Sequence, residues 1–208
     1  MGELHVNMNI TLDGVIQANG GPTEEDKAFR YGGWERPFWD PESEAQITAD
    51  VQASDALLLG RTTYDIFRRY WPGQPDEVGR AFDRVPKYVA SRGTPELSWD
   101  TSFQLTDIAR EVRDLRRRHE QIHTWGSADL LQTLFREHLV DRVNLWMCPV
   151  VIGQGKRLFP DGTPAARFEL TEPPRSYPAG VTLLRLRRLE GAPETADTAE
   201  TAAAATDH

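Results

Sequence analysis

Cysteine is nearly absent from this sequence, because Cys148 is the only one among 208 residues. One thiol cannot form a disulfide within the chain, and it cannot build the Cys-rich ligand sets of structural zinc sites. No apolar run is long enough to span a bilayer, and the N-terminus lacks the basic segment and apolar core of a signal peptide. We therefore expect a cytoplasmic protein with no membrane partner.

A surplus of basic residues is also absent. The chain has 24 Lys and Arg against 32 Asp and Glu, for a formal net charge of -8. Because non-specific nucleic-acid binding requires positive charge, we expect a small-molecule partner and no nucleic acid. Residues 191–208 contain four acids, no Lys or Arg and no large apolar residue. We expect one domain over residues 1–190 and a disordered, acidic Ala/Thr-rich tail over residues 191–208.

The most informative stretch runs from Ile122 to Phe159. Residues 122–125 have strand character, Gly126-Ser127-Ala128-Asp129 is a small polar turn, and residues 128–138 carry apolar side chains at helical spacing. A second apolar run over residues 143–151 predicts another strand, with Pro149 at an edge, an end or a bulge. A small-residue turn that opens a helix leaves unpaired N–H groups at the positive end of the helix dipole. The turn therefore predicts a phosphate or diphosphate site.

Two earlier segments repeat this arrangement. The apolar strand over residues 56–59 ends at Gly60, and Arg61-Thr62-Thr63 opens the next helix. The strand over residues 87–90 is followed by Ser91-Arg92. Ligands of open α/β sheets bind along the carboxyl ends of the strands, so the three ends predict one phosphate-lined rim. The alternative for Thr62 is a helix cap without a ligand.

The N-terminal part predicts a strand over residues 4–12, a turn at Asp13-Gly14, and a long loop over residues 18–41. This loop carries Trp34, Phe38 and Trp39, which either line a pocket or anchor the loop. A helix is expected over residues 42–51. Asp40 fits the N-cap of that helix, with Pro41 at its first position.

The remaining segments complete an α/β pattern without internal repeats. We expect a polar connector over residues 72–85, a helix over residues 106–119, and an antiparallel hairpin formed by residues 168–171 and 181–186. His119, His123 and His138 lack the spacing of metal ligands, so we expect no metal site.

Six motifs occur in an order that matches a known family: residues 8–14 (MNITLDG), 58–64 (LLGRTTY), 87–92 (KYVASR), 126–130 (GSADL), 139–141 (LVD) and 149–159 (PVVIGQGKRLF). Over residues 4–189 the chain resembles the dihydrofolate reductase-like family, in particular the reductase (C-terminal) domain of the riboflavin-biosynthesis deaminase–reductase. The resemblance implies a three-layer α/β fold, with a mostly parallel central sheet, flanking helices and a C-terminal antiparallel hairpin. It also implies a homodimer.

The resemblance implies an NADPH site along the predicted rim. By position, Gly60, Arg61, Thr62 and Thr63 hold the adenosine side and the diphosphate, and Ser91 and Arg92 lie near the 2′-phosphate and adenine. The diphosphate turn comprises Gly126, Ser127, Ala128, Asp129 and Leu130. Two arginines on one rim favour NADPH over NADH. Relatives often have a cis Gly-Gly bond at this turn; because a cis bond costs about 3 kcal/mol outside proline, we expect Gly126-Ser127 to be trans.

The sequence departs from the family near the substrate. Thr124 and Trp125 stand where riboflavin-type reductases usually carry a glutamate, and the bulky Trp125 would fill polar space there. The aromatic loop instead indicates a flat, fairly apolar heteroaromatic substrate, in contact with Trp34, Phe38, Trp39 and Tyr64. Residues 39–42 resemble the Trp and Pro segment that precedes the pocket carboxylate of folate reductases, so the resemblance offers Asp40 or Glu42 as that acid, with the helix cap as the alternative for Asp40. No catalytic dyad is visible; Asp13, Asp40, Glu42 or a bound water are the candidate proton donors. The predicted function is an NADPH-dependent reductase of a small heteroaromatic or carbonyl compound of the pterin/pyrimidine-like class. A flavin- or deazaflavin-dependent reductase and a non-catalytic nucleotide- or ligand-binding protein are the alternatives.

Overall fold

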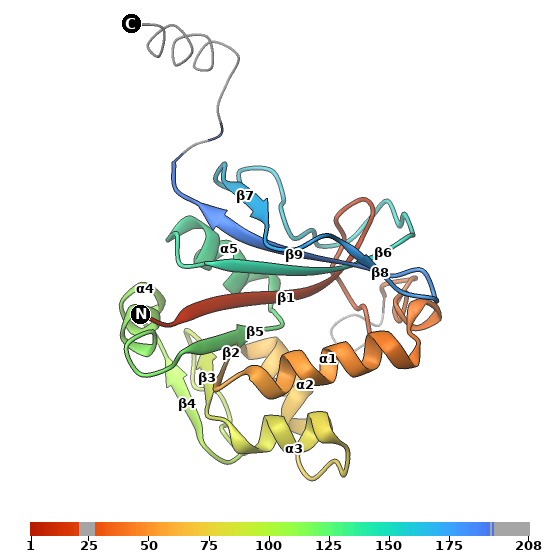
Figure 1. Ribbon diagram of the computed structural model, residues 1–208. Coiled ribbons are helices and arrows are strands. Elements are labelled where there is room, and N and C mark those ends of the chain that lie inside the picture. The colour runs from red at the N-terminus through yellow and green to blue at the C-terminus, as the bar shows by residue number, and fades with distance from the viewer. Residues whose placement is uncertain (21–27, 192, 194–208) are drawn as a thin grey trace, which may run out of the picture.

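A nine-stranded sheet forms the centre of the fold in the computed structural model, which describes residues 1–20, 28–191 and 193. Its strands are β1 (Glu3–Thr11), β2 (Ala56–Gly60), β3 (Lys87–Ala90), β4 (Ser102–Leu105), β5 (Gln121–Thr124), β6 (Arg142–Cys148), β7 (Arg167–Leu170), β8 (Arg175–Ser176) and β9 (Thr182–Leu189). The strand order is β4-β3-β2-β5-β1-β6-β9-β7, with β8 paired to β9 (Figure 1). All pairings among the first six strands are parallel, whereas β9 is antiparallel to β6, β7 and β8. The mostly parallel sheet with a C-terminal antiparallel hairpin is confirmed.

Helices cover both faces of the sheet. They are α1 (Pro41–Ala53), α2 (Arg61–Tyr70), α3 (Glu77–Arg84), α4 (Ile108–Leu115) and α5 (Ala128–Arg136), with a short 3-10 helix, η1 (Arg36–Phe38). On β2, Leu57 and Leu59 pack with α1, α2 and α3, and Leu58 packs with α4 and α5. Because β2 is buried on both faces, its sequence is apolar throughout, as expected for a central parallel strand.

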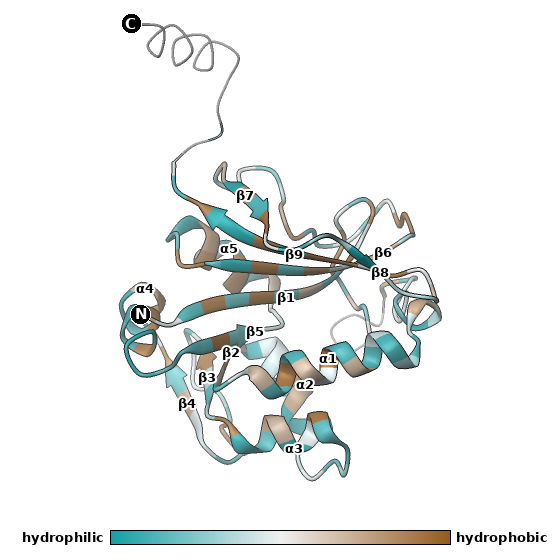
Figure 2. Ribbon diagram, viewed as in Figure 1, coloured by the Kyte–Doolittle hydropathy of each residue, from teal (hydrophilic) through white to brown (hydrophobic). Residues whose placement is uncertain are grey.

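The two faces of β1 differ in chemistry. Figure 2 shows hydrophobic and hydrophilic residues alternating along β1. Leu4, Val6 and Met8 enter the core beside α4 and α5. His5 and Asn7 alternate with them and therefore face the opposite side, the side that carries α1. The sheet thus has a polar surface within an otherwise apolar α1 layer.

Several predicted elements differ from the structure. The connector over residues 72–85 contains α3, which Asp76 caps by accepting a hydrogen bond from Gly79 N. The edge strand β4 was not predicted, because its burial is partial and its sequence mixes polar and apolar residues. β6 ends at Cys148, so Pro149 lies just past the strand, and α4 is shorter than residues 106–119.

Part of two other predictions lies outside the described residues. These are positions 21–27 of the long loop and positions 192 and 194–208 of the tail. The described end of the loop contains η1. In the described part of the chain, every helix is too short or too polar to cross a membrane.

Candidate functional site

Parallel pairing brings the carboxyl ends of β2 and β5 to the same edge of the sheet. Gly60 N, at the end of β2, donates a hydrogen bond to Gly126 O in the turn after β5, at 3.1 Å. A Cβ atom on Gly60 would lie 1.9 Å from Ser127 Oγ, and one on Gly126 would lie 3.1 Å from Thr63 Oγ1. The two predicted glycine turns therefore touch, and only glycine fits at position 60.

The helices that start at this edge have no side-chain caps. α2 begins after Gly60 and α5 after Ser127, and neither N-cap residue accepts a side-chain hydrogen bond from the first turn. By contrast, Asp40, Asp76 and Asp107 cap α1, α3 and α4 with their carboxylates. An anion at the edge would occupy the place that a cap carboxylate occupies in the other three helices.

The end of β3 lies on the same rim. The Arg61 side chain is half exposed, and its Nη1 is 3.4 Å from the position that a Cβ atom would take on Gly93. Ser91 Oγ donates to Gly93 O at 3.2 Å, and Arg92 is exposed. The structure thus gathers the predicted residues of all three strand ends.

At the rim, the first turns of α2 and α5 expose backbone N–H groups more than side chains. Thr62 is half-buried and Asp129 is exposed. Ala128 packs against the core that contains Leu130, whose side chain is buried. Ala128 and Leu130 would therefore meet a ligand only through their N–H groups.

The peptide bond between Gly126 and Ser127 is cis, so the expectation of a trans bond is wrong. Gly126 has a φ of 120°, which its lack of a side chain permits. The Thr124 hydroxyl lies 3.2 Å from Gly126 O and 3.4 Å from Gly126 N, on the inner side of the turn. Packing of the turn against Gly60 and Thr124 overrides the local preference on which the expectation rested.

The aromatic loop packs against the end of β6. Trp34 is buried, and its indole N–H donates to Gln17 O at 2.8 Å. Trp39 lies 5.4 Å from Trp146 between ring centroids, and Phe38 is half-buried in the same cluster. In this structure the three predicted aromatic residues anchor the loop against the end of β6, and only Phe38 and Trp39 keep part of their surface exposed.

Tyr64 is placed differently. Its side chain is fully buried, its hydroxyl lies 3.0 Å from Ser102 Oγ, and it accepts a hydrogen bond from Trp99 N. These contacts place Tyr64 in the core between α2 and the sheet, so a substrate cannot contact it. Tyr64 faces inward, because it is Gly60 and the first residues of α2, before Tyr64, that form the rim.

The three predicted acids have structural partners. Asp40 caps α1 through Glu42 N and Ser43 N and also accepts from Ala179 N, which confirms the cap alternative. Glu42 is exposed and lies 3.7 Å from Arg175. Asp13 accepts hydrogen bonds from the Thr11 hydroxyl and two backbone N–H groups, and the Thr11 bond lowers the pKa of Asp13 to about 2. Asp13 is thus ionised at neutral pH and holds no proton to donate.

Glu35 is an acid that the sequence reasoning missed. It is partly buried within the aromatic loop, where it accepts hydrogen bonds from Asn9 on β1 and from Asn19, the latter at 2.7 Å. Burial raises its pKa above the usual value for glutamate, against these hydrogen bonds, which lower it. The only sequence signal was an acid within the aromatic segment Gly33-Trp34-Glu35-Arg36-Pro37-Phe38-Trp39.

Trp125 precedes the glycine turn and closes the α1 side of the rim. Its ring packs edge-on against Phe82 of α3, with 5.3 Å between centroids, and lies 5.7 Å from His123. A bulky apolar side chain therefore occupies the space at the end of β5, as the sequence predicted.

Comparisons with known proteins agree with this architecture. The family model of the RibD C-terminal domain matches residues 3–180. The uncharacterized protein YyaP of Bacillus subtilis (strain 168) is 28% identical over 182 residues, covering 85% of this chain and 89% of YyaP.

Two solved structures share the fold. A pyrimidine reductase-like protein from Corynebacterium diphtheriae has a TM-score of 0.65 at 15% identity, covering 91% of this chain and 93% of that protein. A dihydrofolate reductase from Enterococcus faecalis, complexed with NADP(H), has a TM-score of 0.58 at 14% identity, covering 91% and 98%. The strand-end geometry and the match over most of the sequence lead to one conclusion: this chain belongs to the RibD C-terminal domain family.

Proposed function

We propose that this protein is an NADPH-dependent reductase of a small, flat heteroaromatic or carbonyl compound of the pterin/pyrimidine-like class. Membership of the RibD C-terminal domain family supports a reductase. The choice of cofactor and substrate class depends on the rim and on the aromatic loop beside it.

The observation that carries the proposal is the pair of uncapped helix N-termini at Gly60 and Ser127, joined by the Gly60–Gly126 hydrogen bond. Two such N-termini suit the two phosphates of a dinucleotide. Arg61 is half exposed beside Gly93, so its guanidinium can pair with a further phosphate without breaking a strong ion pair; Asp65, at 3.6 Å, is its nearest acid. The residues present therefore fit a cofactor with a diphosphate and an extra phosphate.

NADPH, when bound, supplies a hydride. The residues of this chain bind and orient the reactants, and they exclude water. Trp125 and Trp39 are half-buried near the end of the sheet, where Trp39 packs on the buried Trp146 and Trp125 on Phe82, so part of each outer ring faces solvent. Such surface favours a flat apolar ring over a phosphorylated sugar.

A proton must accompany the hydride, and Glu35 is the acid best suited to hold it. Its raised pKa keeps part of the population protonated at a higher pH than an ordinary glutamate. The Asn9 and Asn19 amides orient the carboxyl group, and Trp39 adds a further hydrogen bond. Asp13 and Asp40 do not fill this role, because both carboxylates are engaged in structural hydrogen bonds.

Thermal-shift titration with NADPH, NADH, FMN and a deazaflavin tests the proposal directly. We expect NADPH to raise the melting temperature most, with NADH clearly weaker. A larger shift with FMN or deazaflavin than with NADPH would favour a flavin- or deazaflavin-dependent reductase instead. No shift with any of the four would refute the nucleotide site. NADPH oxidation in the presence of dihydropterin, aminopyrimidine and quinone panels then identifies the substrate class.

A further inference from the structure

The turn that follows β3 is held in place by a side chain of the neighbouring edge strand. Gln104 lies in β4, one residue before that strand ends, and β4 pairs in parallel with β3 (Figure 1). The Gln104 amide donates to two backbone carbonyls of the turn, Gly93 O at 2.6 Å and Ser91 O at 3.1 Å. One half-buried side chain of β4 therefore fixes both ends of the turn Ser91-Arg92-Gly93.

Gln104 approaches the turn from the side of the sheet on which α2 lies. Its neighbour Leu105 packs in the core with α4 and α5. Because side chains alternate along a strand, Gln104 faces the opposite side, as does Ser102, whose hydroxyl lies 3.0 Å from that of Tyr64 in α2. The amide therefore links the turn to the same layer that contains Arg61, the first residue of α2.

The next part of the loop is held by a different side chain. Arg68 of α2 donates to Glu96 Oε2 at 3.0 Å, so the loop is attached to the helix several residues beyond the turn. Arg92 and Gly93 lie between these two attachments, and both are exposed. The conformation of the backbone at Arg92 thus depends strongly on the Gln104 amide.

The turn borders the place where the proposed cofactor would have its extra phosphate. Arg61 Nη1 is 3.4 Å from the position that a Cβ atom would take on Gly93, so this guanidinium lies beside the turn. Arg92 has no ion-pair partner among the residues that the structure describes, and Arg61 has only Asp65, at 3.6 Å. Two guanidinium groups that are this weakly paired suit a doubly charged phosphate. Since Arg61 belongs to α2 and Arg92 to the turn, the turn sets their relative position.

We propose that Gln104 is a positioning residue for nucleotide specificity. By holding the Ser91-Arg92-Gly93 turn, it fixes Arg92 relative to Arg61 and so favours a nucleotide with an extra phosphate over one without it. Both amide hydrogens of Gln104 are already donated to the turn, so the residue acts through Arg92 and does not itself bind the phosphate. This inference rests on the proposed function, because it concerns the same cofactor rim.

The test compares the dissociation constants of the full-length wild type and Gln104→Met for NADPH and NADH, from fluorescence titration. Methionine has nearly the length of glutamine and lacks the amide. We expect about tenfold weaker NADPH binding and NADH binding within about twofold of the wild type, because the loss of two hydrogen bonds frees Arg92 and leaves the diphosphate turn at Gly126 intact. A merely structural role for Gln104 would weaken both nucleotides equally, and that result would overturn the inference.

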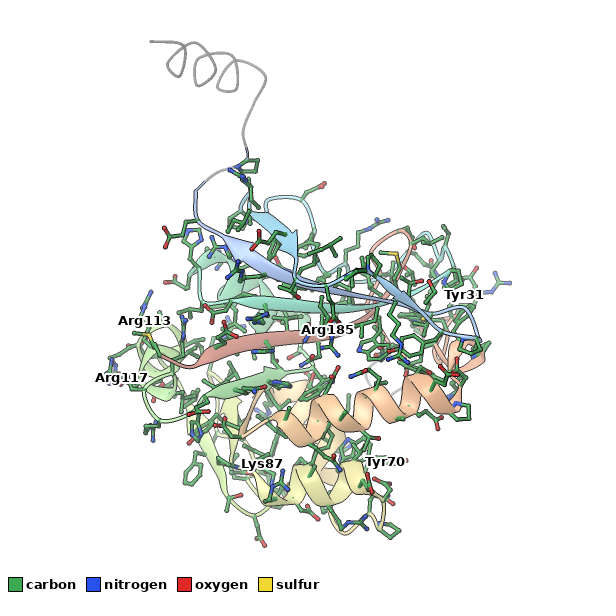
Figure 3. The ribbon with its side chains drawn as sticks, viewed as in Figure 1. Tyr31, Tyr70, Lys87, Arg113, Arg117 and Arg185 are labelled. Carbon is green, nitrogen blue, oxygen red and sulfur yellow. The ribbon has the colours of Figure 1, made fainter. Side chains whose placement is uncertain are left out.

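Gln74→Met is the matched control. The Gln74 amide also donates to a backbone carbonyl, Tyr70 O at 2.8 Å, and Tyr70 is the last residue of α2, at the end of the helix away from the rim. Figure 3 shows Tyr70 close to α3. Both dissociation constants should stay at the wild-type values in this variant. A loss of NADPH preference as large as that in Gln104→Met would show that the effect does not come from the turn, and would contradict the inference.

The pathway through Arg92 is tested by a double-mutant cycle. In the Arg92→Ala background, Gln104→Met should change NADPH binding by less than about twofold, whereas additive losses would overturn the inference. Arg92 is exposed, so Arg92→Ala alone provides the test if Gln104→Met does not fold; it should lose NADPH preference, and a wild-type preference would refute the inference. All these failures leave the proposed function intact if the wild type binds NADPH. Absence of NADPH binding by the wild type would refute the proposed function and the inference together.

Discussion

Gly60 and Ser127 meet so closely that a single methyl group cannot fit between them: a Cβ atom on Gly60 would lie 1.9 Å from Ser127 Oγ and 2.9 Å from Ser127 N. Gly60 ends β2, and Ser127 immediately precedes α5, so the two residues belong to separate βα units. Their contact aligns the N-termini of α2 and α5, on which the proposed cofactor site depends.

Substitution of Gly60 by alanine tests this contact. The φ of Gly60 is -69°, which alanine adopts without strain, so the effect is purely steric. We expect a loss of about 1–3 kcal/mol in the free energy of unfolding, as for other overpacked sites, together with weaker NADPH binding. Urea unfolding and NADPH titration measure both. Ser127→Gly in the same chain removes the Oγ atom and should restore part of the stability; wild-type behaviour of Gly60→Ala would show that the turns are loose.

Arg61→Ala tests the choice between NADPH and NADH. Removal of a charge-assisted hydrogen bond to a phosphate is expected to weaken NADPH binding about ten- to a hundredfold, with a smaller effect on NADH. Arg69→Ala is the matched control, because Arg69 is exposed in the last turn of the same helix. Dissociation constants from fluorescence titration decide the outcome. Equal losses for both nucleotides would place Arg61 away from the extra phosphate.

Asp40 variants separate a helix cap from a catalytic acid. Asp40→Ala removes the acceptor for Glu42 N, Ser43 N and Ala179 N, so the unfolding midpoint should fall. Asp40→Asn retains an acceptor oxygen, and we expect stability and reductase activity close to wild type. Loss of activity in a folded Asp40→Asn protein would return Asp40 to the catalytic candidates.

Glu35→Gln should change the pH dependence of both activity and stability. The pKa of Glu35 is raised in the folded state, so between the unfolded and folded pKa values the folded chain binds more protons, and stability falls as pH rises through this window. The glutamine variant should lack this decline. It should also lower the rate of substrate reduction without weakening NADPH binding, since it has no proton to transfer. An unchanged pH–rate profile would remove Glu35 from the mechanism.

For Lys87 we expect the opposite pH dependence of stability, in the alkaline range. Its ammonium group is buried, donates to Asp83 O and Asp100 O, and lies 4.3 Å from the Trp99 ring centroid. Burial lowers its pKa to about 8, so above that pH the folded chain releases a proton that the unfolded chain retains, and stability rises. Relative to Lys87→Met, the wild type should gain about 1–3 kcal/mol of unfolding free energy between about pH 7 and pH 10. A constant difference across that range would contradict the lowered pKa.

Local patterns predicted the elements that carry strong local signals. β2 is apolar throughout, and α1 starts with Asp40-Pro41, so both were located from the sequence. α3 was missed because Gly79 interrupts its pattern. In the structure that glycine is required, since a Cβ atom there would lie 2.5 Å from Gln74 Cβ. β4 was missed because an edge strand does not need a continuous apolar sequence.

The rim could be predicted from the sequence because its parts are also local. Each of its parts is a short motif in which a strand end, a glycine and a helix start follow one another, and the rule that parallel strands end at one edge gathers them. The position of Glu35 followed no such rule. Asn9, Asn19 and Glu35 come from separate segments of the chain, and their hydrogen bonds form only after the loop packs on β1.

By itself, then, the sequence indicated most of the strands and helices and predicted where an anion would be favoured, because hydrogen bonding and dipoles act over a few residues. Only the tertiary structure decided that Glu35 is partly buried against Asn9 and Asn19, that Tyr64 faces the core, and that the Gly126-Ser127 bond is cis. Those outcomes depend on desolvation and steric contact between segments distant in sequence, and neither can be evaluated before the segments are packed together.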